Sequence, residues 1–334
     1  MTTKTLPLSI LAGLYALVAL FTPTAAAEPT TLDALPRGSG LDAGKGAIVW
    51  SRYDESVMAY RLVVRRGAVN TLPLVDPSPI PFDADVGSDA QGRPAVVYSR
   101  CASYRHDRDW RDRCDLYILS LATGAERKVG SASRAASESG PSLWRGELAW
   151  IADRKAAGPA VYHRSLTAPA SRSSERVPVT ADAVWEIELS GDRLAAIVGH
   201  ETAGGGDSTE VRLVRLRSGS ARRIAFQNIG ENNQTYIGLS FAERKLAWFR
   251  GCFENPGCAG SGAYRFALSN RRYDRALEPR LYAGWAWTGN AVYTAQLSRY
   301  HQDCRVDGSS PPSPCLVSRD VDPEWKRVAA GNVR

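Results

Sequence analysis

Four carboxylates fall at alternate positions in two short extended stretches of the sequence. They are Glu186 with Glu188, and Asp83 with Asp85. Side chains two positions apart on a β-strand share one face, so each pair would project into the same space. Paired acids are the groups with which glycoside-cleaving enzymes work. Any polar channel carries such groups, however, and spacing alone assigns no acid–base roles, so these four are candidate catalytic residues and no more.

An aromatic and arginine-rich stretch occupies residues 102–113. Its candidate ligand-binding residues are Tyr104, Arg105, His106, Trp110 and Arg111. Tyr, Trp and Arg dominate the energetics of recognition surfaces, which favours a binding loop. The alternative is a solvated loop whose alternating charges pair with one another and contribute little. The sequence leaves both interpretations open.

Motifs for cofactors, metals and nucleophilic catalysis are absent from the sequence. There is no G-x-S-x-G elbow, Walker loop, HExxH pair or EF-hand loop. The cysteine spacings form no C-x2-C set, and His106 and His301 are the histidines near them. We therefore expect no cofactor and no metal, and the chain favours binding over catalysis.

A repeated strand must position these residues. A turn followed by a small apolar strand recurs six times, and the last residue of each copy is a Trp or Tyr except in the fourth. These anchor positions are Trp50, Tyr98, Trp150, Ala196, Trp248 and Tyr293, spaced 45 to 52 residues apart. That spacing is the period of a four-stranded propeller blade, and no helical periodicity interrupts it. We predict an all-β fold, a β-propeller of six four-stranded blades around a central axis, with the anchors packed between blades.

The blades differ in one loop. With strands lettered a to d from the axis outward, the distance from the anchor to the end of strand c varies from 14 residues (Trp50 to Val64) to 28 (Tyr293 to Val321). The b–c loops emerge on the same face as the connections between blades, and we call it the loop face. Insertions gathered on one face of a repeat array mark a binding face.

All six cysteines lie in b–c loops. An even number of cysteines in an exported chain indicates disulfides, of which fifteen pairings are formally possible. The repeat alignment selects the local pairing, because each pair then closes one hairpin: Cys101–Cys114, Cys252–Cys258 and Cys304–Cys315. Each bond would contribute about 2 to 4 kcal/mol. We expect the first to close a surface hairpin outside the core between blades.

The N-terminal residues have the pattern of a cleaved export signal. Lys4 precedes an apolar run from Leu6 to Phe21, and Ala25-Ala26-Ala27 precedes Glu28. We expect residues 1–27 to be a signal peptide, residues 28–37 a linker or closing strand, and residues 38–330 one propeller domain. The mature chain is expected to be secreted or periplasmic, with no stable membrane insertion.

The charge pattern argues against one class of partner. The net charge is +7, but acids and bases alternate along the chain. A dispersed excess of this kind does not make a nucleic-acid site.

Closing the ring requires the last blade to join the first. Residues 324–329 match the outer strand of blade 6, and residues 30–35 have the length of a short edge strand. We expect residues 30–35 to pair with blade 6 beyond the C-terminal strand, because pairing protects a bare edge. The alternative is a free N-terminal linker.

The repeats resemble those of the TolB-type propeller family. The stretch from Ser139 to Trp150 has its Pro, aromatic and tight turn before an apolar strand, and Tyr98-Ser99-Arg100 with Asp115-Leu116-Tyr117 is similar to the rest of the repeat. The family's Ser-Pro-Asp-Gly turn is missing, and there is no room for its N-terminal α/β domain. The resemblance implies six blades and a periplasmic or extracellular setting. About function it implies little, because a periplasmic member of the family docks lipoprotein partners, whereas related propellers occur beside or within enzymes.

Three functions compete. The first is a non-catalytic binding propeller that engages a protein or envelope polymer through the loop face. The second is a polysaccharide-active hydrolase or lyase that uses carboxylates near the axis. The third is a structural module. Fold alone does not choose between them.

Overall fold

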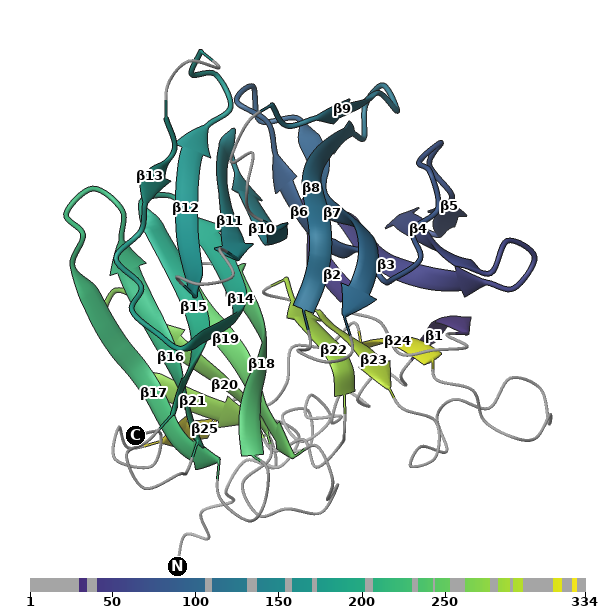
Figure 1. The fold of residues 1–334 in the computed structure, drawn as a ribbon. Coiled ribbons are helices and arrows are strands. Elements are labelled where there is room, and N and C mark those ends of the chain that lie inside the picture. The colour runs from purple at the N-terminus through teal and green to yellow at the C-terminus, as the bar shows by residue number, and fades with distance from the viewer. Residues whose placement is uncertain are drawn as a thin grey trace, which may run out of the picture.

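The structure is a computed structural model, and it describes the chain in fourteen segments. These are residues 30–34, 41–105, 110–130, 137–153, 158–169, 173–201, 207–229, 234–242, 244–252, 262–276, 282–288, 291–296, 315–319 and 326–328. The expected signal peptide, residues 1–27, lies outside them. The described residues form six antiparallel sheets arranged as a propeller (Figure 1). No helix in the described part of the chain is long and apolar enough to cross a membrane.

Each sheet is one blade, and its strands follow the chain outward from the axis. Blade 1 contains β2 (Leu41–Gly44), β3 (Ala47–Asp54), β4 (Ala59–Arg66) and β5 (Val69–Thr71). Blade 2 contains β6 (Asp83–Ser88), β7 (Pro94–Arg105), β8 (Trp110–Ser120) and β9 (Glu126–Lys128). Blade 3 contains β10 (Ser137–Trp144), β11 (Glu147–Asp153), β12 (Pro159–Ser165) and β13 (Glu175–Arg176).

The other three blades complete the ring. Blade 4 contains β14 (Ala183–Ser190), β15 (Arg193–Glu201), β16 (Asp207–Arg215) and β17 (Ala221–Ile229). Blade 5 contains β18 (Gln234–Ala242), β19 (Lys245–Cys252), β20 (Gly262–Ala267), β21 (Tyr273–Ala276) and β25 (Lys326–Val328). Blade 6 contains β22 (Tyr282–Trp287), β23 (Val292–Gln296), β24 (Cys315–Arg319) and β1 (Thr30–Ala34).

The apolar core lies between blades. Six hydrophobic clusters each join two neighbouring sheets. Trp150, for example, is fully buried and packs on Val97 and Ile118 of blade 2. Trp248 packs in the same way on blade 4 and Tyr98 on blade 1. A single twisted sheet leaves both faces exposed to water, so packing against two neighbours is what stabilises each blade.

The ring closes through the N-terminus, but with a different strand order from the one expected. β1 pairs antiparallel with β24, so it takes the outermost place in blade 6 directly (Figure 1). The C-terminal strand β25 pairs with β21 of blade 5. Pairing of the N-terminal segment with blade 6 was therefore right, whereas placing the C-terminal segment in blade 6 was wrong. Both strands are short and polar, so their sequences carry no pattern that distinguishes one sheet edge from another.

Side chains of blade 1 also contact β1, the strand that closes the ring. The Trp50 indole N–H donates to Asp33 Oδ2 at 3.0 Å, and Leu32 packs against Trp50. Asp33 Oδ2 lies 3.7 Å from the Arg52 guanidinium. β1 thus joins the last blade through its backbone and the first blade through its side chains.

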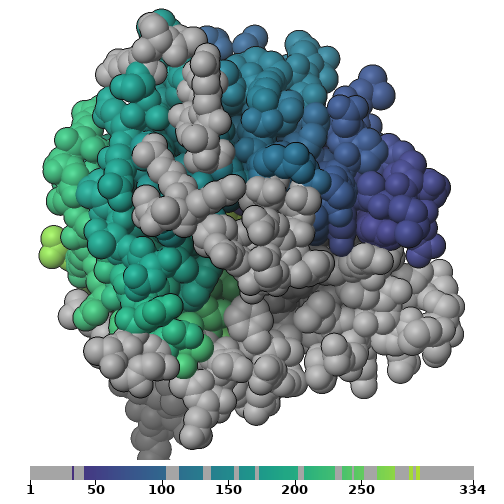
Figure 2. All heavy atoms as spheres, in the orientation of Figure 1, coloured from purple at the N-terminus to yellow at the C-terminus, as the bar shows by residue number. Residues whose placement is uncertain are grey.

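The end of the molecule opposite the loop face is built from short a–b and c–d turns, and we call it the turn face. Four equivalent hydrogen bonds bring the two kinds of turn together. Each runs from a leucine N–H in a c–d turn to a carbonyl in or beside the a–b turn: Leu121 to Pro94, Leu166 to Gly146, Leu216 to Asp192 and Leu268 to Arg244. In the space-filling view, the described residues of the first four blades run from purple on one side of the molecule to green on the other (Figure 2).

Candidate functional site

A cavity of about 220 Å³ lies between the inner strands, toward their loop-face ends. Strands β2, β6, β10, β14 and β18 all contribute to its wall, so it lies where five blades meet. Its polar lining includes five carboxyl side chains: Asp42, Asp83, Asp85, Glu186 and Glu188. Its other lining residues include Leu41, Phe82, Pro141, Trp185 and Ile237.

The structure brings all four sequence-predicted carboxylates to this one cavity and adds Asp42, which the sequence reasoning missed. A signal for Asp42 was present. Within each ladder, Asp42 lies opposite Val49, Asp85 opposite Val97 and Glu188 opposite Ala195. Each partner residue immediately precedes the anchor position, so the three acids occupy the same place in their blades. Aligning inner strands by the anchor would therefore have found Asp42.

Most of these carboxylates are engaged by the backbone of the next blade. Asp42 Oδ2 accepts from Val86 N at 2.7 Å, and Asp85 Oδ2 accepts from Leu143 N. Glu186 accepts from two consecutive N–H groups in blade 5, Gly238 at 2.8 Å and Leu239 at 2.6 Å. Hydrogen bonds to a charged acceptor are about twice as strong as neutral ones. The acids therefore join neighbouring inner strands.

Two serines make the same kind of link at other blade boundaries. Ser142 Oγ accepts from Leu189 N at 2.9 Å, and Ser240 Oγ accepts from Trp287 N at 3.1 Å. Ser142 also donates to Glu188 Oε2 at 3.2 Å. A polar side chain on each of the first five inner strands thus accepts a backbone N–H from the following blade. This repeated contact gives the inner carboxylates a structural role as well as a place at the cavity.

Burial raises the pKa of carboxyl groups that line the cavity. Loss of solvation raises the pKa of Glu186 to about 7, against the lowering effect of the Leu239 and Gly238 N–H groups. Burial, with the nearby Asp85 charge, holds the pKa of Glu188 well above its usual range. Burial and the Asp42 charge likewise raise the pKa of Asp85 well above its usual range. Like charges in one low-dielectric space disfavour joint ionisation, so the site holds protons at neutral pH.

Trp185 gives the cavity an exposed aromatic wall. It is 48 % exposed, whereas the buried anchor tryptophans are nearly inaccessible. An exposed indole beside carboxyl groups suits a ligand with apolar and cationic parts. The described residues contain no group of three or more Asp, Glu, His or Cys side chains placed to hold a metal ion.

The predicted binding stretch of blade 2 forms a regular hairpin. Tyr104 pairs with Arg111, and Arg105 with Trp110, as direct continuations of the β7–β8 ladder. His106 lies outside the described residues. The structure thus brings four of the five candidate residues together at the tip of one two-stranded extension on the loop face.

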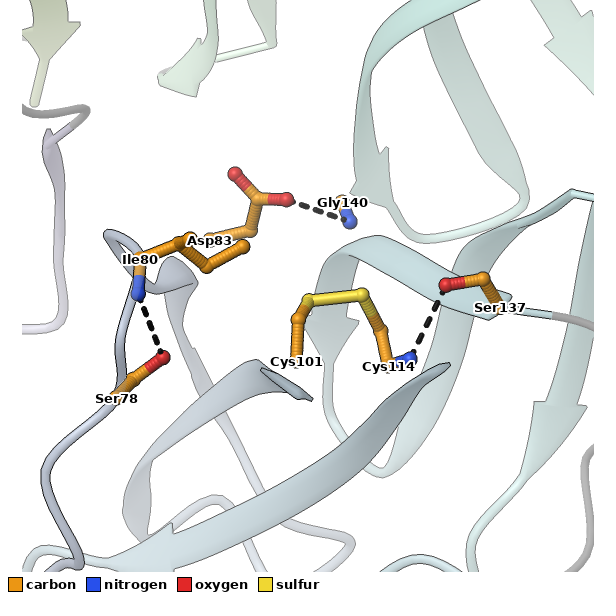
Figure 3. The surroundings of a disulfide bond; sticks show 7 residues. All are labelled: Ser78, Ile80, Asp83, Cys101, Cys114, Ser137 and Gly140. Carbon is orange, nitrogen blue, oxygen red and sulfur yellow. Dashed lines mark hydrogen bonds between the residues drawn. A yellow bond between two sulfur atoms is a disulfide. The ribbon is translucent and has the colours of Figure 1, made fainter. Parts of the chain in front are cut away.

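The Cys101–Cys114 disulfide is present at the base of that hairpin, and it lies deeper than expected. Both cysteines are 3 % exposed and pack against Ile80, on the connection from blade 1. Cys114 N donates to Ser137 Oγ of blade 3 at 3.1 Å, and Asp83 of the cavity lies nearby (Figure 3). The expectation of a surface position was wrong, because both cysteines are buried; they form a small cluster with Ile80 that is separate from the hydrophobic clusters between blades. The hairpin's base is part of the junction of blades 1, 2 and 3.

The other two expected disulfides are not placed. Cys258 and Cys304 lie outside the described residues, so the Cys252–Cys258 and Cys304–Cys315 pairs stay predictions.

Comparison with known proteins defines the fold. A scan against protein-family models finds no match, and no curated protein sequence matches the chain. Among solved structures, TolB from Acinetobacter baumannii aligns with 84 % of this chain at 15 % identity and a TM-score of 0.54. A puromycin-hydrolyzing peptidase from Mycobacterium tuberculosis aligns with 91 % of the chain at 11 % identity and a TM-score of 0.52.

The alignments cover only part of each relative. This chain spans 65 % of the TolB chain and 55 % of the peptidase chain. Similarity at this level of identity shows the arrangement of sheets and says nothing of a shared activity. With its six sheets in a ring and its apolar core between them, the chain has a TolB-like β-propeller fold.

Proposed function

We propose that this protein is an exported, non-catalytic binding propeller that engages a protein partner or an envelope polymer through its loop face. The observation that carries the proposal is the axial cavity, which combines an exposed Trp185 with carboxyl groups at one end of the propeller. Export rests on the signal-like residues 1–27 and on the periplasmic or extracellular setting that the family resemblance implies.

The contacts of the carboxylates favour binding over catalysis. Glu186 accepts two backbone N–H groups, and Asp42 and Asp85 each accept one from the next blade. A general acid or base must reach a reacting group, so acids that hold neighbouring strands together are poorly placed to serve. A basic side chain or amine of the partner that enters the cavity would favour the ionised form of these acids and pair with it.

The loop face offers further apolar contact. Val57 and Met58, at the tip of the β3–β4 hairpin, are 43 % and 72 % exposed. The Tyr104, Arg111 and Trp110 positions of the β7–β8 extension lie on the same face. Aromatic residues, Met and Arg are enriched where proteins meet, so this face has the composition of an interface.

A binding array of purified envelope proteins and envelope polysaccharides tests the proposal. The chain from Glu28 onward should bind one component with a measurable Kd. The Trp185→Ala variant should weaken that binding by at least about tenfold, as an aromatic hot spot would. The matched control is Trp144→Ala on the turn face, which should leave the Kd unchanged. Absence of binding across the array, or equal loss in both variants, would contradict the proposal.

A polysaccharide-active hydrolase or lyase is the second candidate, because one observation favours it. Glu188 and Glu186 hold protons near neutral pH in a cavity that other carboxyl groups line, which is the condition for a general acid. Release of reducing or unsaturated sugar ends from a polysaccharide panel, abolished in Glu188→Gln, would establish it. No release by the unmodified chain would exclude it for that panel.

A further inference from the structure

The turn face carries an excess of basic residues. This excess is not apparent from the sequence, in which acidic and basic residues alternate. In the described part of its a–b and c–d turns, with Arg66 at the adjoining end of β4 included, there are eight basic residues against two acidic ones, Asp89 and Asp192; the strand ends beside these turns also carry Glu126, Glu147 and Glu175. The basic residues are Lys45, Arg66, Arg93, Arg145, Arg217, Arg244, Arg271 and Arg272. All eight are exposed. The sequence predicted a dispersed charge, but folding places these residues at one end because the turns of successive blades share that end.

Almost all of these cations are without a counter-ion among the residues that the structure describes. Arg93 pairs with Asp89 at 2.7 Å. The other seven form no ion pair with any described residue; Arg66 donates to the Leu121 carbonyl, and Lys45 and Arg145 lie over the Trp144 ring. Unpaired like charges repel one another and raise the free energy of the folded state, so clustering them is unfavourable without an external anion.

The backbone supplies a second, independent observation. Lys45, Arg145 and Arg244 occupy equivalent a–b turns of blades 1, 3 and 5, with φ of 50°, 47° and 62°. Arg271, in a c–d turn, has φ of 58°. Two-residue hairpin turns of this kind favour Asn, Asp or Gly at left-handed positions. Three blades therefore place a long cation where the turn itself favours a small or short polar residue.

The shape of the turn face decides between anionic partners. The cations are distributed over short turns of five blades. Lys45 also lines a pocket between blades 1 and 6, but the other cations lie on turns spread around the ring. A nucleic acid or polysaccharide strand is bound along a track, whereas a lipid surface presents anionic groups across a plane. Each Lys or Arg near such a surface contributes a similar attraction, so cations spread over a broad face act together.

We propose that the turn face docks this protein onto the surface of an anionic phospholipid bilayer. Binding is peripheral and electrostatic, since it rests on exposed cations of the turns. The loop face then points away from the bilayer, toward a partner. The inference uses residues on the opposite end from the proposed binding cavity, so either proposal can fail without the other.

Co-sedimentation with vesicles tests the inference. The chain from Glu28 onward should bind vesicles rich in phosphatidylglycerol, should not bind pure phosphatidylcholine, and should dissociate as salt is raised. The triple variant Lys45→Asn, Arg145→Asn, Arg244→Asn should bind on the order of a hundredfold more weakly. Because Asn is favoured at positive φ, this variant should fold normally, which its circular dichroism and Tm would verify.

The matched control removes three exposed cations from outer strands. The variant Arg127→Asn, Lys128→Asn, Arg176→Asn changes the net charge equally, but its residues lie on β9 and β13. It should retain most of the vesicle binding. Equal loss in both triples would overturn the proposal in favour of net charge alone. Equal binding to neutral vesicles would overturn it too, as would capture by immobilised alginate without any vesicle binding.

Discussion

Blades 3 and 4 use the same pair of positions in opposite ways. In blade 3, Trp150 lies opposite Tyr162, and the rings stack with centroids 6.0 Å apart. Blades 2 and 5 repeat this arrangement with Tyr98–Tyr117 and Trp248–Tyr264. In blade 4 the pair is Ala196 and Arg212. An aromatic stack that packs against the previous blade is thus replaced by a small residue and a cation.

Blade 4 compensates with a buried carboxylate. Glu210 is 6 % exposed and lies 2.7 Å from Arg212 Nε and 3.4 Å from Arg223 Nη1. Arg212 also donates to the Thr180 carbonyl at 2.7 Å, on the connection from blade 3. The comparison teaches that one repeat can fill the same inter-blade space with apolar area or with an ion cluster. The first tolerates changes of polarity nearby, while the second depends on every member being present.

The largest effect should come from removing an aromatic anchor. Trp150→Ala would delete a fully buried ring between blades 2 and 3 and leave a cavity. We expect the free energy of unfolding to fall by about 4 kcal/mol in urea denaturation followed by circular dichroism. Trp185→Ala is the matched control, because that ring is half exposed, and it should cost less than about 1 kcal/mol. Similar losses in the two variants would show that the anchors do not carry the core.

Glu210→Gln should have the next largest effect. It leaves Arg212, whose side chain is 22 % exposed, without its charged partner, so the free energy of unfolding should fall by about 3 kcal/mol. The double variant Glu210→Leu, Arg212→Leu should be less destabilised than Glu210→Gln, since the arginine left without Glu210 is then Arg223, whose side chain is 55 % exposed and solvated. The Asp54–Arg61 pair, whose side chains are 27 % and 32 % exposed, is the control, and Asp54→Asn should cost less than about 1 kcal/mol. If the double variant has a lower free energy of unfolding than Glu210→Gln, blade 4 depends on the shape of these side chains and not on their charge.

The sequence predicted the blades because anchor spacing is a property of the chain, but it did not predict blade 4. Ala196 was visible as the exception among six anchors. Glu210, Arg212 and Arg223 read as polar positions in strands, and only the ladder shows that they meet. Charge on a strand is usually solvated, so a buried ion cluster gives no signal until the fold places its members together.

For the axial site, the sequence predicted which carboxylates share a strand face but not the contacts that they make. Alternation placed Glu186 and Glu188 on one strand face, and both line the cavity. Their hydrogen-bond partners lie in other blades: Gly238, 52 residues from Glu186, and Ser142, 46 residues from Glu188. Contacts of that kind depend on how neighbouring inner strands are offset, which no local pattern records.

The contrast between close packing and charge extends to the inner strands. At the boundary of blades 2 and 3, a Cβ added to Gly87 would lie 1.8 Å from the Leu143 carbonyl oxygen. Gly87→Ala must therefore push two inner strands apart, and we expect a loss of about 2 to 3 kcal/mol in the free energy of unfolding. Gly130→Ala is the control, because nothing lies within 4 Å of the added atom. A neutral Gly87→Ala would mean that this boundary is loosely packed.

Blades 4 and 5 meet through Glu186 instead, so their contact should depend on pH. The pKa of Glu186 in the folded protein is about 7, above its ordinary value of 4.5, because burial disfavours the charged form. The folded state then binds the proton more tightly than the unfolded state does. The stabilisation is complete below about pH 4.5, and it is lost as the pH rises through about 7.

This pH dependence is the smallest effect we expect, because the cavity admits some solvent. Between pH 5 and pH 8 Glu186 should account for a loss of at most about 2 kcal/mol in the free energy of unfolding. Burial raises the pKa of Asp85 and Glu188 as well, so the whole cavity contributes in the same direction. Subtracting the urea profile of Glu186→Gln from that of the unmodified chain isolates the single residue. Coincident profiles at both pH values would mean that Glu186 is charged throughout, and that the Gly238 and Leu239 N–H groups fully offset its burial.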